Sequence, residues 1–193
     1  MSYSYCTLSP LLDPRAVQIV ELPDKVERYF YLTKGRPVAP HLPPTTEFSL
    51  YERAGDMLTD FIGNPDCVLY VSERAQQVLA ARGLVGAAVE LLPFVLLDKR
   101  GRKMREPYFI ANPLRSVSCV DRERSKYRLD GPDEIGDIRM LHVRDDSIPG
   151  DAQLFRVAEF PEMMVLRSDL LEAFQQAGLT GLAVHPTGTE IPG

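Results

Sequence analysis

The chain has 193 residues and a formal net charge of −5, with 45% hydrophobic and 25% charged side chains. This length and composition predict one compact globular domain and exclude extended disorder or a collagen-like chain. Because 22 basic residues face 27 acidic ones, the chain lacks the excess of cations that nucleic-acid binding needs. We therefore expect no nucleic-acid partner.

The cysteines and the apolar stretches indicate a reduced, cytoplasmic location. Cys6, Cys67 and Cys119 are spread along the chain without a CxxC spacing, so the sequence predicts neither a disulfide framework nor a zinc site. No basic segment leading into an apolar one is present at the N-terminus. The most apolar stretch, residues 85–97, contains a glutamate and a proline and is shorter than a membrane span. We expect no membrane partner.

The chain before residue 68 has the weakest pattern, and its first part, residues 1–36, is the least certain. Residues 16–22 and 47–51 could form strands, and residues 56–62 could form a short helix. Between them, four prolines within residues 37–44 predict an extended connector.

Two later segments repeat one order of features, which predicts a duplicated strand–helix–strand unit. The turns Gly83-Leu84-Val85-Gly86 and Gly178-Leu179-Thr180-Gly181 lie 95 residues apart. The predicted strand, helix and strand are 68–71, 72–82 and 87–92 in the first unit, and 163–166, 168–177 and 182–185 in the second.

Local residue types support the helix boundaries in both units. Ser72 and Ser168 are placed to cap the helix N-termini. Gly83 and Gly178 are placed at the left-handed position that ends a helix. Since these glycines close helices instead of opening them, they are typical of structural caps and not of a phosphate-binding loop.

Between the units, the sequence predicts a series of short strands. Residues 89–97 and 107–111 are expected to form a hairpin around a charged turn, with Asn112-Pro113 ending the second strand. Further strands are expected at 116–120, 124–129, 138–143 and 153–160, with an acidic loop at 130–137 and a frayed tail at 187–193. This order predicts an α+β fold, with two or three helices on a mixed, largely antiparallel sheet, in a single domain 1–193.

Catalytic chemistry has little support in the residues. His41, His142 and His185 lack metal-ligand spacing, and no nucleophile, zinc or phosphate-loop motif occurs. We expect no catalytic residue, metal or cofactor. Two alternatives stay open: a small hydrolase-type enzyme in which Cys67 or Cys119 meets a histidine in space, and a scaffolding protein.

Charged clusters fall on predicted loops. The basic cluster from Lys99 to Arg105 is expected to be a solvated hairpin tip. Acidic residues after Val120, Asp130 and Arg144 are typical either of plain solubility or of a negatively charged face that docks a basic protein.

An ordered set of motifs resembles a known family. The set begins at Thr59-Asp60-Phe61 and continues through the strand and helix start Leu69-Tyr70-Val71-Ser72-Glu73-Arg74 and the strand Val89 to Pro93. It then includes Tyr108 to Asn112, Val120-Asp121 with Ser125 and Tyr127, Phe155-Arg156 with Glu159, and the turn Gly178 to Gly181. Over about residues 37–186 the chain resembles immunity family eleven of bacterial polymorphic toxin systems.

The resemblance implies a cytoplasmic protein that binds and neutralises a cognate bacterial toxin without catalysis. Its oligomeric state is left open. Acidic loops would guide the approach of a basic toxin, and Arg124, Tyr127 and Arg144 are candidate anchors. The full set of candidate toxin-binding residues is Asp121, Glu123, Arg124, Tyr127, Asp133, Glu134, Asp137, Arg144, Asp145 and Asp146.

Overall fold

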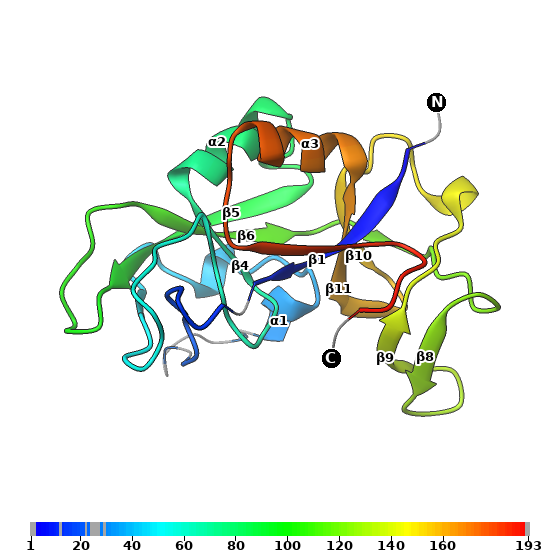
Figure 1. Ribbon diagram of the computed structural model, residues 1–193, viewed down its shortest axis with the longest axis horizontal. Helices are drawn as coiled ribbons and strands as arrows, with labels where there is room; N and C mark the ends of the chain where they lie inside the picture. Colours follow the sequence, from blue (N-terminus) through cyan, green and yellow to red (C-terminus); the bar gives the residue numbers. More distant parts are fainter. Residues whose placement is uncertain (1–2, 12, 22, 24–27, 29, 192–193) are drawn as a thin grey trace.

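The computed structural model describes residues 3–11, 13–21, 23, 28 and 30–191. It contains two five-stranded sheets with the strand orders β12-β1-β11-β10-β7 and β2-β5-β6-β4-β3, and a separate hairpin of β8 and β9 (Figure 1). Mixed, largely antiparallel sheets with three α-helices confirm the predicted α+β class.

The elements have the following bounds. The first sheet contains β1 (Tyr5–Pro10), β7 (Ser116–Val117), β10 (Leu154–Val157), β11 (Phe160–Arg167) and β12 (Leu182–Pro186). The second contains β2 (Glu47–Ser49), β3 (Phe61–Ile62), β4 (Leu69–Ser72), β5 (Val89–Leu97) and β6 (Tyr108–Pro113). The hairpin is β8 (Lys126–Leu129) and β9 (Ile135–Met140). The helices are α1 (Phe30–Thr33), α2 (Glu73–Ala81) and α3 (Ser168–Gln176), with 3₁₀ turns η1 (Ala39–His41) and η2 (Asp145–Ser147).

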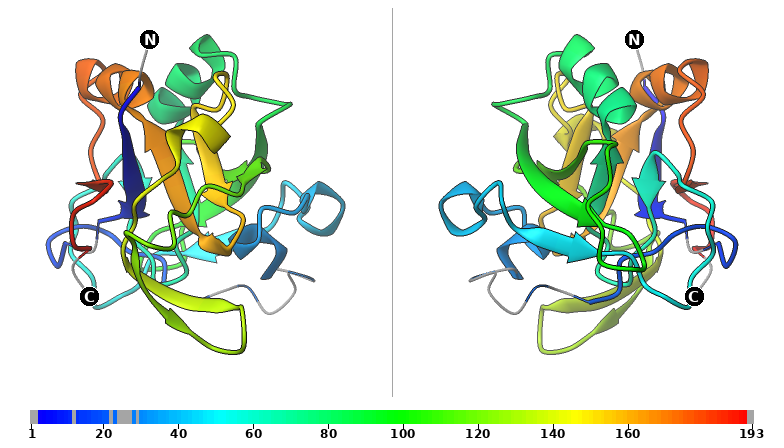
Figure 2. Two further views of the ribbon diagram at one scale, coloured as in Figure 1. Left: turned by 90° about the vertical axis from the view of Figure 1, so that its right-hand side faces the viewer. Right: turned by 90° about the vertical axis from the view of Figure 1, so that its left-hand side faces the viewer.

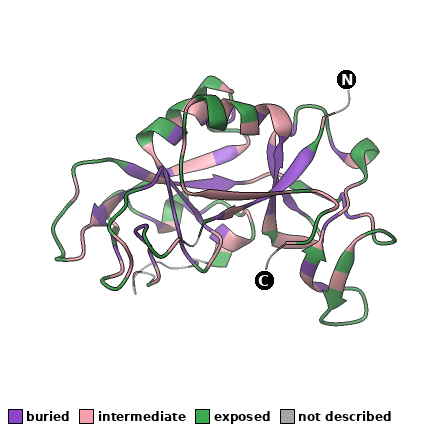
Figure 3. Ribbon diagram, in the orientation of Figure 1, coloured by how far each residue is buried: buried purple, intermediate pink, exposed green. Residues whose placement is uncertain are grey.

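Three groups of buried side chains hold these layers together. The first group lies where α2 and α3, side by side, cover both sheets (Figure 2), and it includes Leu79 and Phe174 from the two helices. The second packs N-terminal residues such as Ile19 and Leu32 against the far face of the second sheet. The third fills the space between the first sheet and the β8–β9 hairpin. The strands are therefore mostly buried, whereas the helices expose their outer faces (Figure 3).

The two halves repeat one arrangement, which confirms the duplicated unit. Helices α2 and α3 have nine residues each, and their first residues are 95 apart. Gly83 and Gly178 have φ of 69° and 63°, while Gly86 and Gly181 have φ of 100° and 91°. These positive values favour glycine at all four positions.

The middle strand of each unit comes from a different part of the chain. In the first unit, β6 lies antiparallel between β4 and β5. In the second unit, the N-terminal strand β1 lies antiparallel between β11 and β12. Both strands have six residues, begin with tyrosine and end with proline. The N-terminus thus completes the second unit.

Several local predictions are wrong. Residues 56–62 do not form a helix, because Phe61 and Ile62 pair with β4. Residues 16–22 make only the isolated bridges Ala16–Met57 and Gln18–Gly63, and Leu22 lies outside the described residues. The N-cap of α3 is Arg167, without a side-chain cap bond. Ser168 is instead the first helical residue, and its N–H donates to the carbonyl of Ser4 at 2.9 Å.

Other boundaries differ by a few residues, since tertiary pairing decides where a strand ends. β6 runs through Pro113, which takes the last place opposite Val89. The expected strand 116–120 is regular only over Ser116–Val117, and the expected strand 153–160 is split into β10 and the start of β11. β9 begins at Ile135, within the expected acidic loop.

Residues 187–191 are bonded to the β8–β9 hairpin. The N–H of Gly188 donates to the carbonyl of Leu141 and that of Ile191 to Arg139. Lys126 forms an ion pair with Glu190 at 2.7 Å. This part of the expected frayed tail is therefore attached, and Pro192 and Gly193 lie outside the described residues.

The equivalent glycines of the two units give a first prediction. A Cβ at Gly86 meets nothing within 4 Å, whereas a Cβ at Gly181 would lie 2.1 Å from the carbonyl oxygen of Phe61. Gly86→Ala should cost only the left-handed backbone penalty, about 1 kcal/mol. Gly181→Ala should cost about 2 kcal/mol more, because the backbone of β3 has to move. Urea unfolding of both variants measures the difference, and equal costs would contradict the packing of this turn against β3.

Candidate functional site

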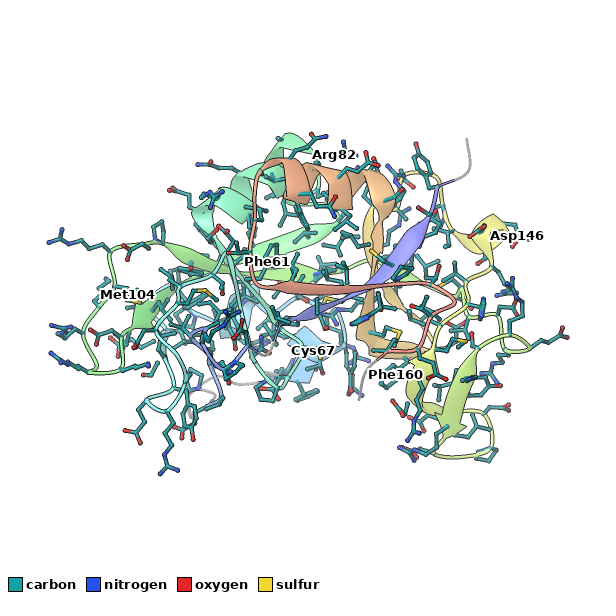
Figure 4. All side chains as sticks on the ribbon, viewed as in Figure 1. Phe61, Cys67, Arg82, Met104, Asp146 and Phe160 are labelled. Carbon is teal, nitrogen blue, oxygen red and sulfur yellow. The ribbon has the colours of Figure 1, made fainter. Side chains whose placement is uncertain are left out.

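The ten candidate residues all lie at one end of the molecule. Asp145 and Asp146 are in η2, Asp133 and Glu134 are at the tip of the β8–β9 hairpin, and residues 121–124 form a turn before β8. Two backbone bonds join these segments: the Asp121 N–H donates to His142 at 2.9 Å, and the Arg144 N–H donates to Cys119 at 2.8 Å. Asp146 marks this end in Figure 4.

Only some of the candidates share one depression. Asp121, Glu123 and Arg144 line a hollow of about 610 Å³. Its other lining residues are Ser118, Val120, Arg122 and Glu159. Tyr127 is half-buried and packs against the third core group, so its ring is only partly free to contact a partner.

Charge at this end is largely compensated. Between residues 118 and 146, eight acidic side chains are accompanied by six basic ones. Asp133 pairs with Arg122 at 3.7 Å, and Asp137 pairs with Arg139 at 3.5 Å. Asp121 accepts the N–H groups of Glu123 and Arg124. Glu123, Glu134, Asp145 and Asp146 form no ion pair with a described residue, so the uncompensated negative charge is spread over η2, the hairpin tip and the turn before β8.

Glu159 is a lining residue that the candidate set lacks. Its Oε1 accepts a hydrogen bond from Ser118 Oγ at 2.7 Å, and its Oε2 is buried without a partner among the described residues. The sequence could have indicated Glu159, because it follows Phe155-Arg156 in the motif that resembles the family.

At the opposite end, the loop between β5 and β6 carries the basic cluster. A depression of about 470 Å³ lies beside this loop, where Leu58 and Met104 meet Arg100 and Arg102. Met104 marks this end in Figure 4. The two charged ends are thus separated by the length of the molecule.

Asp60 forms a buried polar centre where the two units meet. Its carboxylate accepts hydrogen bonds from Ser72 Oγ at 2.7 Å, the Thr180 N–H at 3.0 Å and Thr180 Oγ1 at 3.1 Å. Arg74 approaches it at 3.3 Å. Because its acceptor positions are filled from inside the chain, Asp60 connects structural elements and leaves little capacity for a ligand.

Arg156 is a second buried polar centre. Its guanidinium donates to the carbonyls of Leu32, Thr33, Pro113 and Pro161 at 2.6 to 3.2 Å. Burial lowers its pKa to about 10. This side chain connects α1 to both sheets. The arginine of the Phe-Arg motif in the family resemblance therefore has a structural role.

The cysteines lie in surroundings that suppress their reactivity. Burial raises the pKa of Cys6 to about 11 and that of Cys119 to about 12. Burial also raises the pKa of Cys67, as do the charges of Glu162 and Asp66. A nucleophilic thiol needs a lowered pKa. Neither of the two depressions described above is lined by a cysteine or a histidine.

The residues that the structure describes contain no group of three or more histidine, cysteine or carboxylate side chains arranged to hold a metal ion. They also contain no helix of the length and apolarity that a membrane crossing needs.

Comparison with protein families gives the decisive observation. Residues 12–189 match the model of the immunity protein family Imm11. This chain belongs to the Imm11 family. The match confirms the resemblance and extends it at both ends, taking in most of the N-terminal residues that the motifs did not cover. No curated protein matches the chain. Membership of an immunity protein family suggests a role other than catalysis.

Asp60 yields a prediction about stability. Asp60→Ala would leave the Thr180 N–H and the Ser72 hydroxyl without their acceptor, and should lower the free energy of unfolding by about 3 kcal/mol. Asp146→Ala, at an exposed residue, should change it by less than about 0.5 kcal/mol. Urea denaturation followed by circular dichroism measures both. If the two variants are equally stable, Asp60 does not join the units as described.

The thiols yield a prediction about reactivity. In the folded protein at pH 8, Cys119 should react with a disulfide reagent more than about a hundred times slower than free cysteine, because its thiolate is scarce and its side chain is covered. Cys67, the only partly exposed thiol of the three, should react first. Mass spectrometry of the labelled protein assigns the sites. Equal rates for Cys67 and Cys119 in the folded state would refute the burial of Cys119.

Proposed function

We propose that this protein is an immunity protein that binds a cognate bacterial toxin in the cytoplasm and neutralises it without catalysis or a cofactor. The observation that carries the proposal is membership of the Imm11 family over residues 12–189. The raised pKa values of the three thiols agree with a role that needs no nucleophile.

The binding surface that we propose contains the ten candidate residues at the η2 end. Arg124 and Arg144 are exposed there, and arginine is enriched among the residues that dominate interface energies. Asp145 and Asp146 provide uncompensated negative charge that would guide a basic region of the toxin towards them. Backbone hydrogen bonds hold both η2 and the turn at residues 121–124 in place. Little conformational entropy would therefore be lost on binding.

Co-expression tests the function. The toxin domain encoded beside this protein should kill host cells alone and should lose its toxicity when this protein is co-expressed. The two proteins should elute together in a one-to-one complex. A toxin that stays fully lethal, or a mixture that elutes as separate components, would reject the proposal.

Two variants localise the contact. Arg124→Ala/Arg144→Ala should raise the Kd of the complex about tenfold or more. Lys34→Ala, at an exposed lysine outside the candidate set, is the control and should leave the Kd unchanged. Calorimetry measures both. An unchanged Kd in the double variant would exclude these anchors but not the function.

A further inference from the structure

The β5–β6 loop and its surroundings form a second surface, which we call the basic hairpin surface. It consists of the residues lining the 470 Å³ depression, together with the neighbouring Met57, Lys103 and Arg105. The depression has an apolar floor and a charged rim; its lining residues are Val17, Leu50, Asp56, Leu58, Asp98, Lys99, Arg100, Arg102 and Met104.

Apolar side chains are exposed at this surface. Met57 is 45% exposed and Leu58 is 37% exposed, and they are consecutive in the chain. Backbone bonds from Met57 to Arg15 and from Val17 to Met57 hold this segment in place. Contiguous exposed apolar groups with a polar rim are typical of protein interfaces. The surface therefore offers a preformed place for an apolar side chain.

The rim has an excess of positive charge. Between Asp98 and Glu106 the loop contains five basic and two acidic residues. Lys99 pairs with Asp56, and Arg102 pairs with Asp98, in both cases within 2.8 Å. Arg100, Lys103 and Arg105 form no ion pair with any described residue. At the η2 end acidic residues outnumber basic ones, whereas in this loop the basic residues are in excess.

We infer that the basic hairpin surface binds an acidic segment of the cognate toxin, with an apolar side chain of that segment seated against Leu58 and Met104. This inference rests on the proposed function for the identity of the partner. Carboxylates on the segment pair with Arg100 and Lys103, neither of which has an ion-pair partner among the described residues. Arginine in particular can receive a carboxylate through two parallel hydrogen bonds.

The same features favour a protein segment over a nucleic acid. Among the described residues, the depression is lined by no aromatic side chain on which a base could stack, and the net charge of −5 would repel a nucleic acid from the rest of the molecule. An acidic segment with one apolar anchor uses both the rim and the floor.

The experiment measures binding of the neighbouring-gene toxin domain by surface plasmon resonance at two salt concentrations. Arg100→Glu/Lys103→Glu should reduce the association rate at low salt about tenfold or more and should flatten its salt dependence. Lys34→Glu/Arg36→Glu is the control, with the same change of charge at two exposed residues away from this surface and outside the candidate set. Leu58→Ala should instead raise the dissociation rate several-fold while leaving the association rate unchanged.

The outcomes separate this inference from the proposed function. Loss of association in Arg100→Glu/Lys103→Glu but not in the control, with faster dissociation in Leu58→Ala, supports the surface. Wild-type binding that is unaffected by these three changes, or affected equally by the control, overturns it and leaves the immunity role intact. No wild-type binding rejects the proposed function itself. Circular dichroism of each variant establishes that a loss of binding is not a loss of folding.

Discussion

The carboxylate of Asp60 is the point on which the arrangement of the two repeat units depends. It reaches the N-cap serine of α2 in its own unit and the turn after α3 in the other, through Ser72 and Thr180. The N–H of Asp60 also donates to Thr180 Oγ1 in that turn, at 3.2 Å. One buried side chain thus fixes the start of one helix relative to the end of the other. In a low-dielectric interior such a carboxylate stabilises only when all its partners are in place, so it selects one relative position of the units.

Two arginines, one in α2 and one directly after it, add further polar contacts between the two helices. Near the start of α2, Arg74 donates to the carbonyl of Ala177 at the end of α3, at 2.6 Å. After the end of α2, Arg82 pairs with Asp169 in the first turn of α3 and donates to Gln153 at 2.9 Å. The helices therefore run in opposite directions with a polar contact at each end. Asp169 is also favourably placed at the positive end of the α3 dipole, where Arg167 holds its pKa below the ordinary value.

Local signals were enough to predict the repeat, and long-range pairing explains what they missed. The Gly-Leu-x-Gly turns and the helix stripes depend on neighbouring residues, so both units are visible in the sequence. β1 is not, because the strand that completes the second unit pairs with residues about 160 positions away, as between Cys6 and Leu166. The helix expected at 56–62 failed for the same reason. The residues next to Asp60 and Phe61 in the sequence do not favour an extended backbone. The backbone is extended because Phe61 pairs with Val71 and Asp60 is bonded to Thr180.

At the candidate surface, the sequence likewise did not reveal which charged side chains pair in space. From their acidic composition, the loops after Val120, Asp130 and Arg144 were predicted to form one docking face, and in the structure they lie at one end of the molecule (Figure 1). The sequence could not show that Arg122 and Arg139 neutralise Asp133 and Asp137, because those pairs form across the hairpin and along β9. It equally could not show that Lys99 is held by Asp56 and by the carbonyl of Ala54, while Arg100 stays unpaired.

Both charged ends are attached to one core, which bears on how the molecule could bind a partner. The η2 end is fixed by the chain around Cys119 and by the attachment of residues 187–191 to β9. The basic hairpin is fixed by Lys99 to the loop at Ala54. Surfaces that are already ordered lose little entropy on association, so affinity at either end depends on the fit and desolvation of a few side chains and not on folding upon binding. Under the proposed function, two ordered surfaces of opposite charge would block a toxin without a moving part, provided that the toxin presents complementary charges to both ends.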